Sequence, residues 1–259
     1  MRQAIVLTSF GVADAAERAR TIDCIALDLR VKFKDYDVLE AYTSAFLRKK
    51  IRAQEGREIP ALPDVLERLV REAYTRALIL PTHLTPGEEY EAKIRAPYEA
   101  YRDRLADLRL AAPVLAGAED APRVLTALLM DLHVRPGEQL VLMGHGSPHR
   151  HNPVYDALQA HIDSEGLPIH VGVLEPSDTP RFDDVLARLR ASAASEVLLA
   201  PLLLTGGRHV RQDLAGEQSD SWVSRLRAAR VSVRVSMHGL GEYPAFRALY
   251  LAKAAEALA

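Results

Sequence analysis

Three histidines lie within seven positions, where an apolar run passes into a polar, turn-forming segment. His145, His149 and His151 belong to the stretch VLMGHGSPHRHNPVY, residues 141–155. An imidazole has a reference pKa of about 6.5, so it can bind a divalent metal or exchange a proton near neutral pH. Taken alone, this stretch leaves three roles open: solvated loop residues, ligands of a metal site, or an acid/base pair.

Two further potential ligands follow other apolar runs in the same half of the chain. The run IHVGVLE ends at Glu175, and EVLLAPLLLT is followed by GGRH, which ends at His209. Ligands of open α/β sheets collect outside the carboxyl ends of the strands, so we expect His145, Glu175 and His209 at one edge. Two imidazoles and a carboxylate suit Co²⁺, Fe²⁺, Ni²⁺ or Zn²⁺, and three protein ligands leave positions open for a reacting metal. For each residue taken singly, a solvated or capping role is the alternative.

The elements that would position these residues alternate short apolar runs with longer segments of helical period. AIVLTSF, RALILPTH, QLVLMGH and EVLLAPLLLT are such runs. In contrast, VLERLVREA is apolar at positions i, i+3, i+4 and i+7 from Leu66, and VLARLRASA is apolar at positions i, i+3 and i+7 from Leu186. Continuous apolar strands separated by amphipathic helices are typical of a parallel sheet that is covered on both faces. The predicted fold class is therefore α/β, with doubly wound, Rossmann-like sheets.

The predicted strands fall into two groups that repeat one motif. IVLTSFG aligns with LVLMGHG, and VLERLVREAYTRALILPTHLTPGEEYE aligns with VLARLRASAASEVLLAPLLLTGGRHVRQ, so that Glu89 corresponds to His209. We therefore predict two similar half-domains, an N-terminal one over residues 1–135 and a C-terminal one over residues 136–259, separated near a Pro-Gly break. The second carries the metal ligands, and Glu89 of the first is expected to face them across a cleft between the two half-domains.

Composition excludes several classes of protein. The 259 residues are 48% hydrophobic and carry 33 basic against 35 acidic side chains. This balance argues against disorder and gives no whole-surface attraction to nucleic acid. The single cysteine, Cys24, rules out an internal disulfide and any CxxC motif. No segment approaches the roughly 18 apolar residues of a membrane span, and the N-terminal run is too short for a secretory signal, so we expect a cytoplasmic protein without a membrane partner.

Common nucleotide-binding and hydrolytic motifs are absent. The segment GHGSPH has His149 where the dinucleotide-binding pattern GxGxxG needs its third glycine. The patterns GxxxxGK[ST], GxSxG and HExxH do not occur either. The predicted chemistry therefore proceeds without a nucleotide.

In chain order, PTHLTPGEEYE, VLMGHGSPHRHNPVY, GGRHVRQDLAGEQSDSW and GLGEYPAF resemble segments of the anaerobic-type sirohydrochlorin cobaltochelatases. These belong to the class II, ATP-independent chelatases, which are related to ferrochelatase, and the resemblance covers nearly the whole chain. It implies two α/β half-domains facing a central cleft, and insertion of Co²⁺ into sirohydrochlorin in anaerobic cobalamin biosynthesis. It also implies a small tetrapyrrole as partner, Co²⁺ or Fe²⁺ as metal substrate, no prosthetic group, and a homo-oligomer.

The resemblance also implies roles for individual residues. His145 would bind the metal and accept pyrrole protons, His209 would be the second histidine ligand, and Glu175 would complete the metal site. Glu89 matches a cleft glutamate implicated in catalysis and would relay protons. Arg208 stands where the family often has an acidic residue; it adds a positive charge beside a metal ligand and leaves the metal preference open.

Sirohydrochlorin is a polycarboxylate, so the rim of its binding site is expected to be locally basic despite the balanced total charge. Two aromatic side chains are the best candidates to lie against the macrocycle, although either could instead belong to the core. His149 and His151 are expected to face the ligand or solvent and not to coordinate the metal. The predicted substrate-binding residues are Phe10, Tyr90, His149, Arg150, Arg208 and Arg211.

Two other functions stay open on the sequence. An iron chelatase of sirohaem synthesis would use the same ligands, because this ligand set does not separate Co²⁺ from Fe²⁺. A non-catalytic carrier of metal or tetrapyrrole would need His209 and Glu175 but no proton acceptor at His145.

Overall fold

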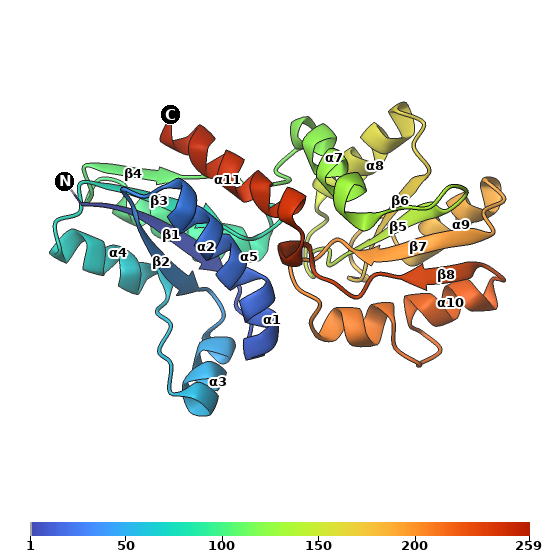
Figure 1. Cartoon of the computed structure of the whole chain (residues 1–259), viewed down its shortest axis with the longest axis horizontal. Coiled ribbons are helices and arrows are strands. Elements are labelled where there is room, and N and C mark those ends of the chain that lie inside the picture. Colours follow the sequence, from blue (N-terminus) through green and yellow to red (C-terminus); the bar gives the residue numbers. More distant parts are fainter. Residues whose placement is uncertain (1) are drawn as a thin grey trace. The chain divides into compact units, whose positions relative to one another are not determined.

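The computed structural model describes residues 2–259 and contains two compact units, each built on a parallel sheet of four strands (Figure 1). The first unit extends to Ala116 and also includes Arg247–Ala259, and the second is Gly117–Phe246. These ranges differ from the expected 1–135 and 136–259. Sequence periodicity locates a helix but does not show against which sheet it packs.

Two helices account for the difference. Helix α7 (Ala121–Leu132) belongs to the second unit, although it precedes that unit's first strand. Helix α11 (Pro244–Leu258) returns almost entirely to the first unit. There Arg247 donates from Nε to Asp28 at 2.6 Å, and the Tyr250 hydroxyl donates to the Thr82 carbonyl at 3.1 Å.

The first sheet has the strand order β2-β1-β3-β4, and all of its pairings are parallel. Its strands are β1 (Gln3–Ser9), β2 (Asp37–Tyr42), β3 (Arg76–Pro81) and β4 (Asp107–Leu110). Its helices besides α11 are α1 (Ala15–Arg20), α2 (Ile22–Lys32), α3 (Ala45–Glu55), α4 (Leu62–Arg71), α5 (Glu88–Tyr90), the π-helix η1 (Glu91–Arg95) and α6 (Ala96–Tyr101).

The second sheet repeats this arrangement with the order β6-β5-β7-β8, again all parallel. Its strands are β5 (Gln139–Gly144), β6 (Ile169–Val173), β7 (Glu196–Pro201) and β8 (Ser232–Val235). Its helices besides α7 are η2 (Ala118–Asp120), α8 (Pro153–Ser164), α9 (Phe182–Ala191), the π-helix η3 (Val210–Leu214), α10 (Trp222–Ala228) and η4 (Leu240–Glu242). The predicted α/β class and the pair of similar parallel sheets are confirmed.

The apolar runs form central strands because both of their faces are covered. In β1, Ile5 and Val6 are fully buried, and Val6 packs in one cluster with Leu66 and Leu69 of α4. The second sheet has an equivalent cluster, in which strands β5 and β7 pack against α9, α10 and the π-helix η3. Full burial on both faces explains why these strands are continuously apolar and not alternating.

The register of the second sheet brings the ends of three strands level. Gly144 at the end of β5 pairs with Val173 at the end of β6, and Met143 pairs with Pro201 at the end of β7. Because the strands are parallel, the segments that follow them all leave from one edge of the sheet, which we call the carboxyl edge of the second unit.

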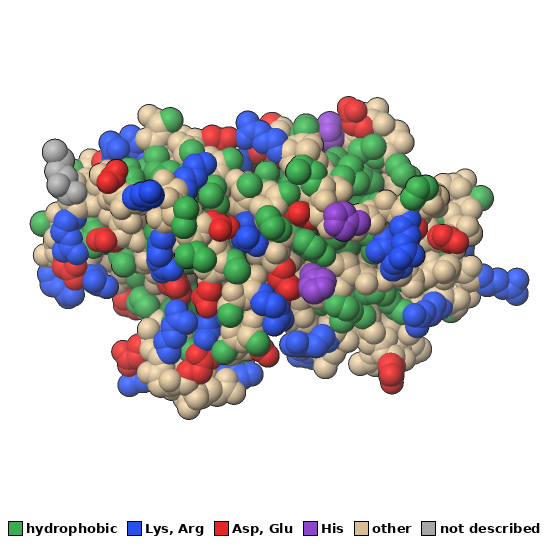
Figure 2. All heavy atoms as spheres, in the orientation of Figure 1, with side chains coloured by type: hydrophobic (Ala, Val, Ile, Leu, Met, Phe, Trp, Pro, Cys, Tyr) green, Lys and Arg blue, Asp and Glu red, His purple; other side chains and the backbone are tan. Residues whose placement is uncertain are grey.

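The surface carries charges of both signs. Acidic and basic side chains are intermixed over the face shown in Figure 2, with apolar side chains scattered between them. In residues 2–259, no helix combines the length and the hydrophobicity that crossing a membrane requires.

Candidate metal centre

Two imidazole rings meet at the carboxyl edge of the second unit. His145 directly follows β5, and His209 directly precedes the π-helix η3. Their ring centroids are 5.0 Å apart, and the two ring planes are almost perpendicular at 89°. Nδ1 of His145 lies 3.8 Å from Oε1 of Glu175, which follows β6. The structure thus brings together the three residues that the sequence predicts as metal ligands.

The backbone places Glu175 beside His145. Leu174 N donates to the Gly144 carbonyl at 3.1 Å, and Glu175 N donates to the His145 carbonyl at 3.0 Å, so the pairing of β5 with β6 continues past both strands. Gly146 allows the chain to turn here with a φ of +83°, a backbone conformation that residues with a side chain rarely adopt. A Cβ at this position would lie 3.0 Å from the Cβ atoms of Glu175 and of Val173.

His209 is held by the first turn of η3. Val210 and Leu214 of this π-helix are fully buried in the core of the second unit, whereas His209 is exposed. Asp213, four residues after His209, accepts a hydrogen bond from His209 Nδ1 at 2.7 Å. π-Helical turns are rare and are frequent at functional sites.

Both rings turn Nδ1 toward an oxygen of the protein. His145 Nδ1 lies 3.2 Å from the Gly146 carbonyl oxygen, and His209 Nδ1 contacts the Asp213 carboxylate. These oxygens only accept hydrogen bonds, so the contacts require the proton on Nδ1 and leave the Nε2 lone pair of each ring for a metal. The side chains are accessible, since His145 is 43% exposed and His209 47% exposed.

The three side chains do not form a closed ligand set. Across residues 2–259, no group of three or more His, Cys, Asp or Glu side chains is arranged to hold a metal ion. Coordination by nitrogen and oxygen needs each ligand atom about 2.0–2.2 Å from the ion. The rings of His145 and His209 would have to turn their Nε2 atoms, together with a Glu175 oxygen, toward one point.

Comparison with known proteins identifies the family of this chain. The family model described as cobalt chelatase (CbiK) matches residues 3–259. The chain belongs to this family of cobalt chelatases. A sirohydrochlorin cobaltochelatase from Salmonella typhimurium is 31% identical over 259 residues, which cover 100% of this chain and 97% of the relative. The sirohydrochlorin cobaltochelatase CbiKC of Nitratidesulfovibrio vulgaris is 32% identical over 254 residues, which cover 96% of this chain and 88% of the relative.

Solved structures confirm the chelatase-like fold. SirB from Bacillus subtilis with Fe³⁺ superimposes with a TM-score of 0.63 and 17% sequence identity, over 100% of this chain and 96% of that chain. At this identity the similarity establishes the fold alone.

The predicted basic rim of this cobalt chelatase chain is accessible. His149 and Arg150 are exposed on the loop that carries His145, and Arg208 and Arg211 flank His209 and are exposed too. Arg208 donates from Nε to Gln212 within the same turn, at 2.7 Å. Their positions fit the prediction that they contact substrate carboxylates, which stays a prediction.

In the first unit, the two predicted aromatic contacts have different surroundings. Phe10 follows β1 directly and is 52% exposed, so its ring is available to a ligand. Tyr90 is only 2% exposed and belongs to the core cluster of this unit together with Ile94. The prediction that Tyr90 lies against the macrocycle is therefore not supported, because its ring is needed to cover the sheet. Glu89, the preceding residue, is partly exposed.

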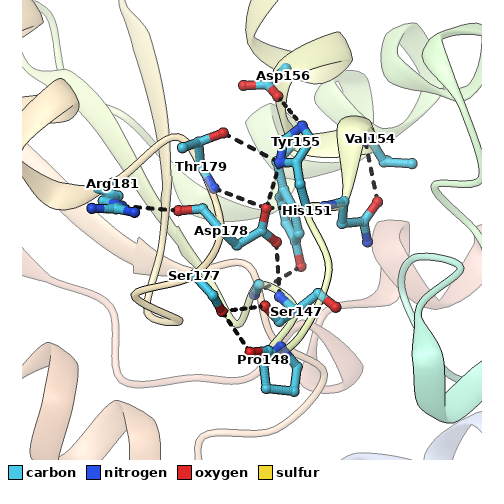
Figure 3. A network of polar contacts seen from close by, with 12 residues as sticks. Ser147, Pro148, His151, Val154, Tyr155, Asp156, Ser177, Asp178, Thr179 and Arg181 are labelled. Carbon is cyan, nitrogen blue, oxygen red and sulfur yellow. Dashed lines mark hydrogen bonds and ion pairs between the residues drawn. The ribbon is translucent and has the colours of Figure 1, made fainter.

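His151 is exposed, and its ring contacts two carboxylates. Its Nδ1 lies 2.7 Å from Oδ1 of Asp178 and its Nε2 lies 2.8 Å from Oδ2 of Asp156 (Figure 3). Both ring nitrogens are thus engaged by carboxylate oxygens of the second unit. That His151 does not coordinate the metal stays a prediction.

Sequence reasoning assigned no role to three residues of interest. Asp213 had a detectable signal, because it lies four residues after His209 on a helical turn. Asp178 had none, because it lies in a loop whose course the sequence does not reveal. The third is His83, just after β3: both of its ring nitrogens are buried and no hydrogen-bond partner for either occurs in residues 2–259. Burial lowers the pKa of His83 to about 4, so the ring is neutral near pH 7.

Proposed function

We propose that this chain is a sirohydrochlorin cobaltochelatase that inserts Co²⁺ into sirohydrochlorin without ATP, in the anaerobic route to cobalamin. One observation carries the proposal: the rings of His145 and His209 are 5.0 Å apart, with Glu175 beside His145, in a chain of the cobalt chelatase family. The names of the curated relatives support sirohydrochlorin as the macrocycle and cobalt as the metal.

The proposed reaction exchanges protons for a metal ion. The free-base macrocycle loses two pyrrole N–H protons while Co²⁺ loses water ligands and takes their place, so two protons leave for each ion inserted. His145 serves this exchange because a neutral imidazole either binds a metal or accepts a proton. One nitrogen cannot do both at once, so His145 acts in sequence: it releases the ion and then takes a proton.

The other two side chains of the centre hold and deliver the ion. His209 offers Nε2, with its tautomer set by Asp213, and Glu175 offsets the positive charge as the ion moves. Glu89, on the first unit, relays protons to solvent in this proposal. The open, half-exposed ligand set suits a metal that is a substrate, because a chelatase must give its ion up.

The test is an anaerobic absorbance assay with purified protein, sirohydrochlorin and Co²⁺ in the absence of ATP. We expect insertion faster than the spontaneous reaction, and loss of that acceleration in both His145→Ala and His209→Ala. His161→Ala is the matched control, because it makes the same change in α8, away from the carboxyl edge. Substituting Fe²⁺ for Co²⁺ ranks the two metals.

The outcomes separate the alternatives. Faster insertion of Fe²⁺ than of Co²⁺ would favour the iron chelatase of sirohaem synthesis. Tight macrocycle binding without acceleration would contradict an enzyme and favour a carrier. Self-association and a cytoplasmic location stay predictions, and sedimentation velocity of the full chain would check the first.

A further inference from the structure

A buried carboxylate lies beside the loop that carries His145. Asp178 belongs to the segment between β6 and α9, three residues after Glu175, and its side chain has no exposed surface. Figure 3 shows this carboxylate at the centre of a network of polar contacts. A buried charge is costly unless hydrogen bonds compensate for it. The segments that supply the donors around Asp178 therefore indicate its structural role.

Most of those donors belong to the His145 loop. Oδ2 of Asp178 accepts from Ser147 N at 2.8 Å. Oδ1 accepts from Asn152 N at 3.0 Å, and it lies 2.7 Å from His151 Nδ1. A further donor, Thr179 N at 2.9 Å, comes from the residue that follows Asp178. One carboxylate thus ties down the loop at three positions, from two to seven residues after His145.

Ser177 adds two contacts of the same kind. Its hydroxyl lies 3.0 Å from the Ser147 carbonyl and 2.7 Å from the Pro148 carbonyl, and its single proton is shared between these two oxygens. The side chains of two neighbouring residues therefore satisfy both the N–H and the carbonyl of Ser147. Several hydrogen bonds thus join the loop after His145 to the segment between β6 and α9.

The attachment also fixes Glu175. Asp178 N donates to the Glu175 carbonyl at 3.1 Å, which closes a turn over residues 175–178. Glu175 N in turn donates to the His145 carbonyl at 3.0 Å. The segment that holds the His145 loop is thus the segment that presents the glutamate.

We propose that Asp178 is a positioning residue of the metal centre, which locks the His145 loop onto the Glu175 turn so that both side chains reach the ion together. This inference rests on the proposed function. Asp178 itself does not touch the ion, because both of its oxygens already accept hydrogen bonds inside the protein. Its effect on the reaction is to pre-organise the groups that do.

The experiment compares three variants of the full chain. Asp178→Asn keeps the size of the side chain but loses its charge, and it turns an NH₂ group toward N–H donors. Asp178→Ala removes the acceptor altogether. Asp184→Asn is the matched control, because Asp184 accepts from Arg181 N at 2.7 Å in the same segment but has an exposed side chain on α9. Each protein is assayed for kcat and KM in Co²⁺ insertion, for its melting temperature, and for Co²⁺ binding without macrocycle by visible absorbance.

We expect kcat to fall by about 10- to 100-fold in Asp178→Ala and by less in Asp178→Asn, the range typical of groups that orient metal ligands. Co²⁺ binding weakens in the same order and its visible spectrum changes, while Asp184→Asn stays within about twofold of the wild type. A purely structural role would lower the melting temperature and leave kcat and the Co²⁺ spectrum of the folded protein unchanged, which would overturn the proposal.

Ser177→Ala keeps the test decisive if both Asp178 variants fail to fold. It removes the hydroxyl that the Ser147 and Pro148 carbonyls share, without disturbing a buried charge, and a wild-type kcat with wild-type Co²⁺ binding would then contradict the positioning role. Failure of the proposed function looks different, because the wild type itself would not accelerate insertion. An active wild type, inactive His145→Ala and unaffected Asp178 variants would reject the positioning role alone.

Discussion

At the scale of single residues, the centre depends on which nitrogen of each imidazole carries the proton. Asp213 fixes this for His209, because a carboxylate 2.7 Å from Nδ1 holds the proton there and leaves Nε2 free for a metal. The carboxylate is 45% exposed, so solvent screens its charge, but it still selects the tautomer.

Asp213→Ala should therefore weaken Co²⁺ binding and lower the rate of insertion by about tenfold, the lower end of the range for such orienting groups. Titration with Co²⁺ followed by visible absorbance measures the first effect, and the insertion assay the second. Glu217→Gln, which also removes a carboxylate just beyond η3, is the control. If Asp213→Ala and Glu217→Gln changed Co²⁺ binding and the insertion rate by the same amount, Asp213 would have no specific effect on the tautomer of His209.

His83 is a residue whose effect we expect on stability and not on metal chemistry. Its pKa of about 4 is below the value of 6.5 for an unperturbed imidazole. Between these values the unfolded chain binds the proton and the folded chain does not, so the free energy of unfolding falls as the pH is lowered from about 6.5 toward 4. His170, whose pKa burial also lowers to about 4, acts in the same direction.

His83→Phe should remove the part of this dependence that is due to His83. Between pH 7 and pH 5 the wild type should lose about 2 kcal/mol more stability than the variant. Because the ring nitrogens of His83 have no hydrogen-bond partner within the described residues 2–259, a phenyl ring should be tolerated at pH 7. Urea unfolding at the two pH values measures the difference, and parallel losses in both proteins would contradict the assignment.

At the scale of elements, the sequence predicted where the strands end but not how the following loops are joined. His145, Glu175 and His209 could be placed at one edge because parallel strands share the direction in which they end. The π-helical turn at His209 could not be foreseen, because a single extra residue per turn leaves no periodic pattern. Asp178 escaped for a related reason: most of its partners are backbone N–H groups, which every residue except proline has.

Gly146 offers a test of the loop as an element. Gly146→Ala forces a side chain into a left-handed conformation and against the Cβ atoms of Glu175 and Val173 at 3.0 Å. The conformational cost alone is about 1–2 kcal/mol. In addition, the close contact should displace Glu175, a predicted ligand of the metal centre. We expect a lower melting temperature and a strong loss of insertion activity.

Gly137→Ala is the control for that substitution. Gly137 has a similar φ of +86°, but a Cβ there would meet no atom within 4 Å. It should carry the same conformational cost and leave insertion unchanged at temperatures where the protein is folded. If both alanine variants keep full activity, the close contact between Gly146 and the Glu175 segment does not matter for the reaction.

At the scale of the whole molecule, the repeat in the sequence predicted two similar sheets, and the structure contains them. The boundary could not be predicted, because it depends on where α7 and α11 pack. Tyr90 was ambiguous for the same kind of reason, and the structure places it in the core. An aromatic residue beside a candidate glutamate has the same sequence context whether it faces a ligand or the core. Long-range packing decides such cases, and a single sequence contains no direct record of it.

The membership of α11 in the first unit has a consequence for how the molecule unfolds. Tyr250 is completely buried, and its hydroxyl donates to the Thr82 carbonyl at 3.1 Å. Tyr250→Ala should cost about 3–5 kcal/mol, as for other large aromatic residues in a core. If α11 stabilises the first unit, this loss should appear there first, because proteins open in cooperative parts.

Hydrogen exchange followed by mass spectrometry would show it. In Tyr250→Ala, we expect amides of β1 and β3 to exchange much faster, and those of β5 and β7 to change far less. Leu226→Ala in α10, a fully buried residue of the second unit, should give the opposite pattern. Equal acceleration in both sheets by either variant would mean that the two units unfold together as one, and that the C-terminal helix stabilises the whole chain and not the first unit alone.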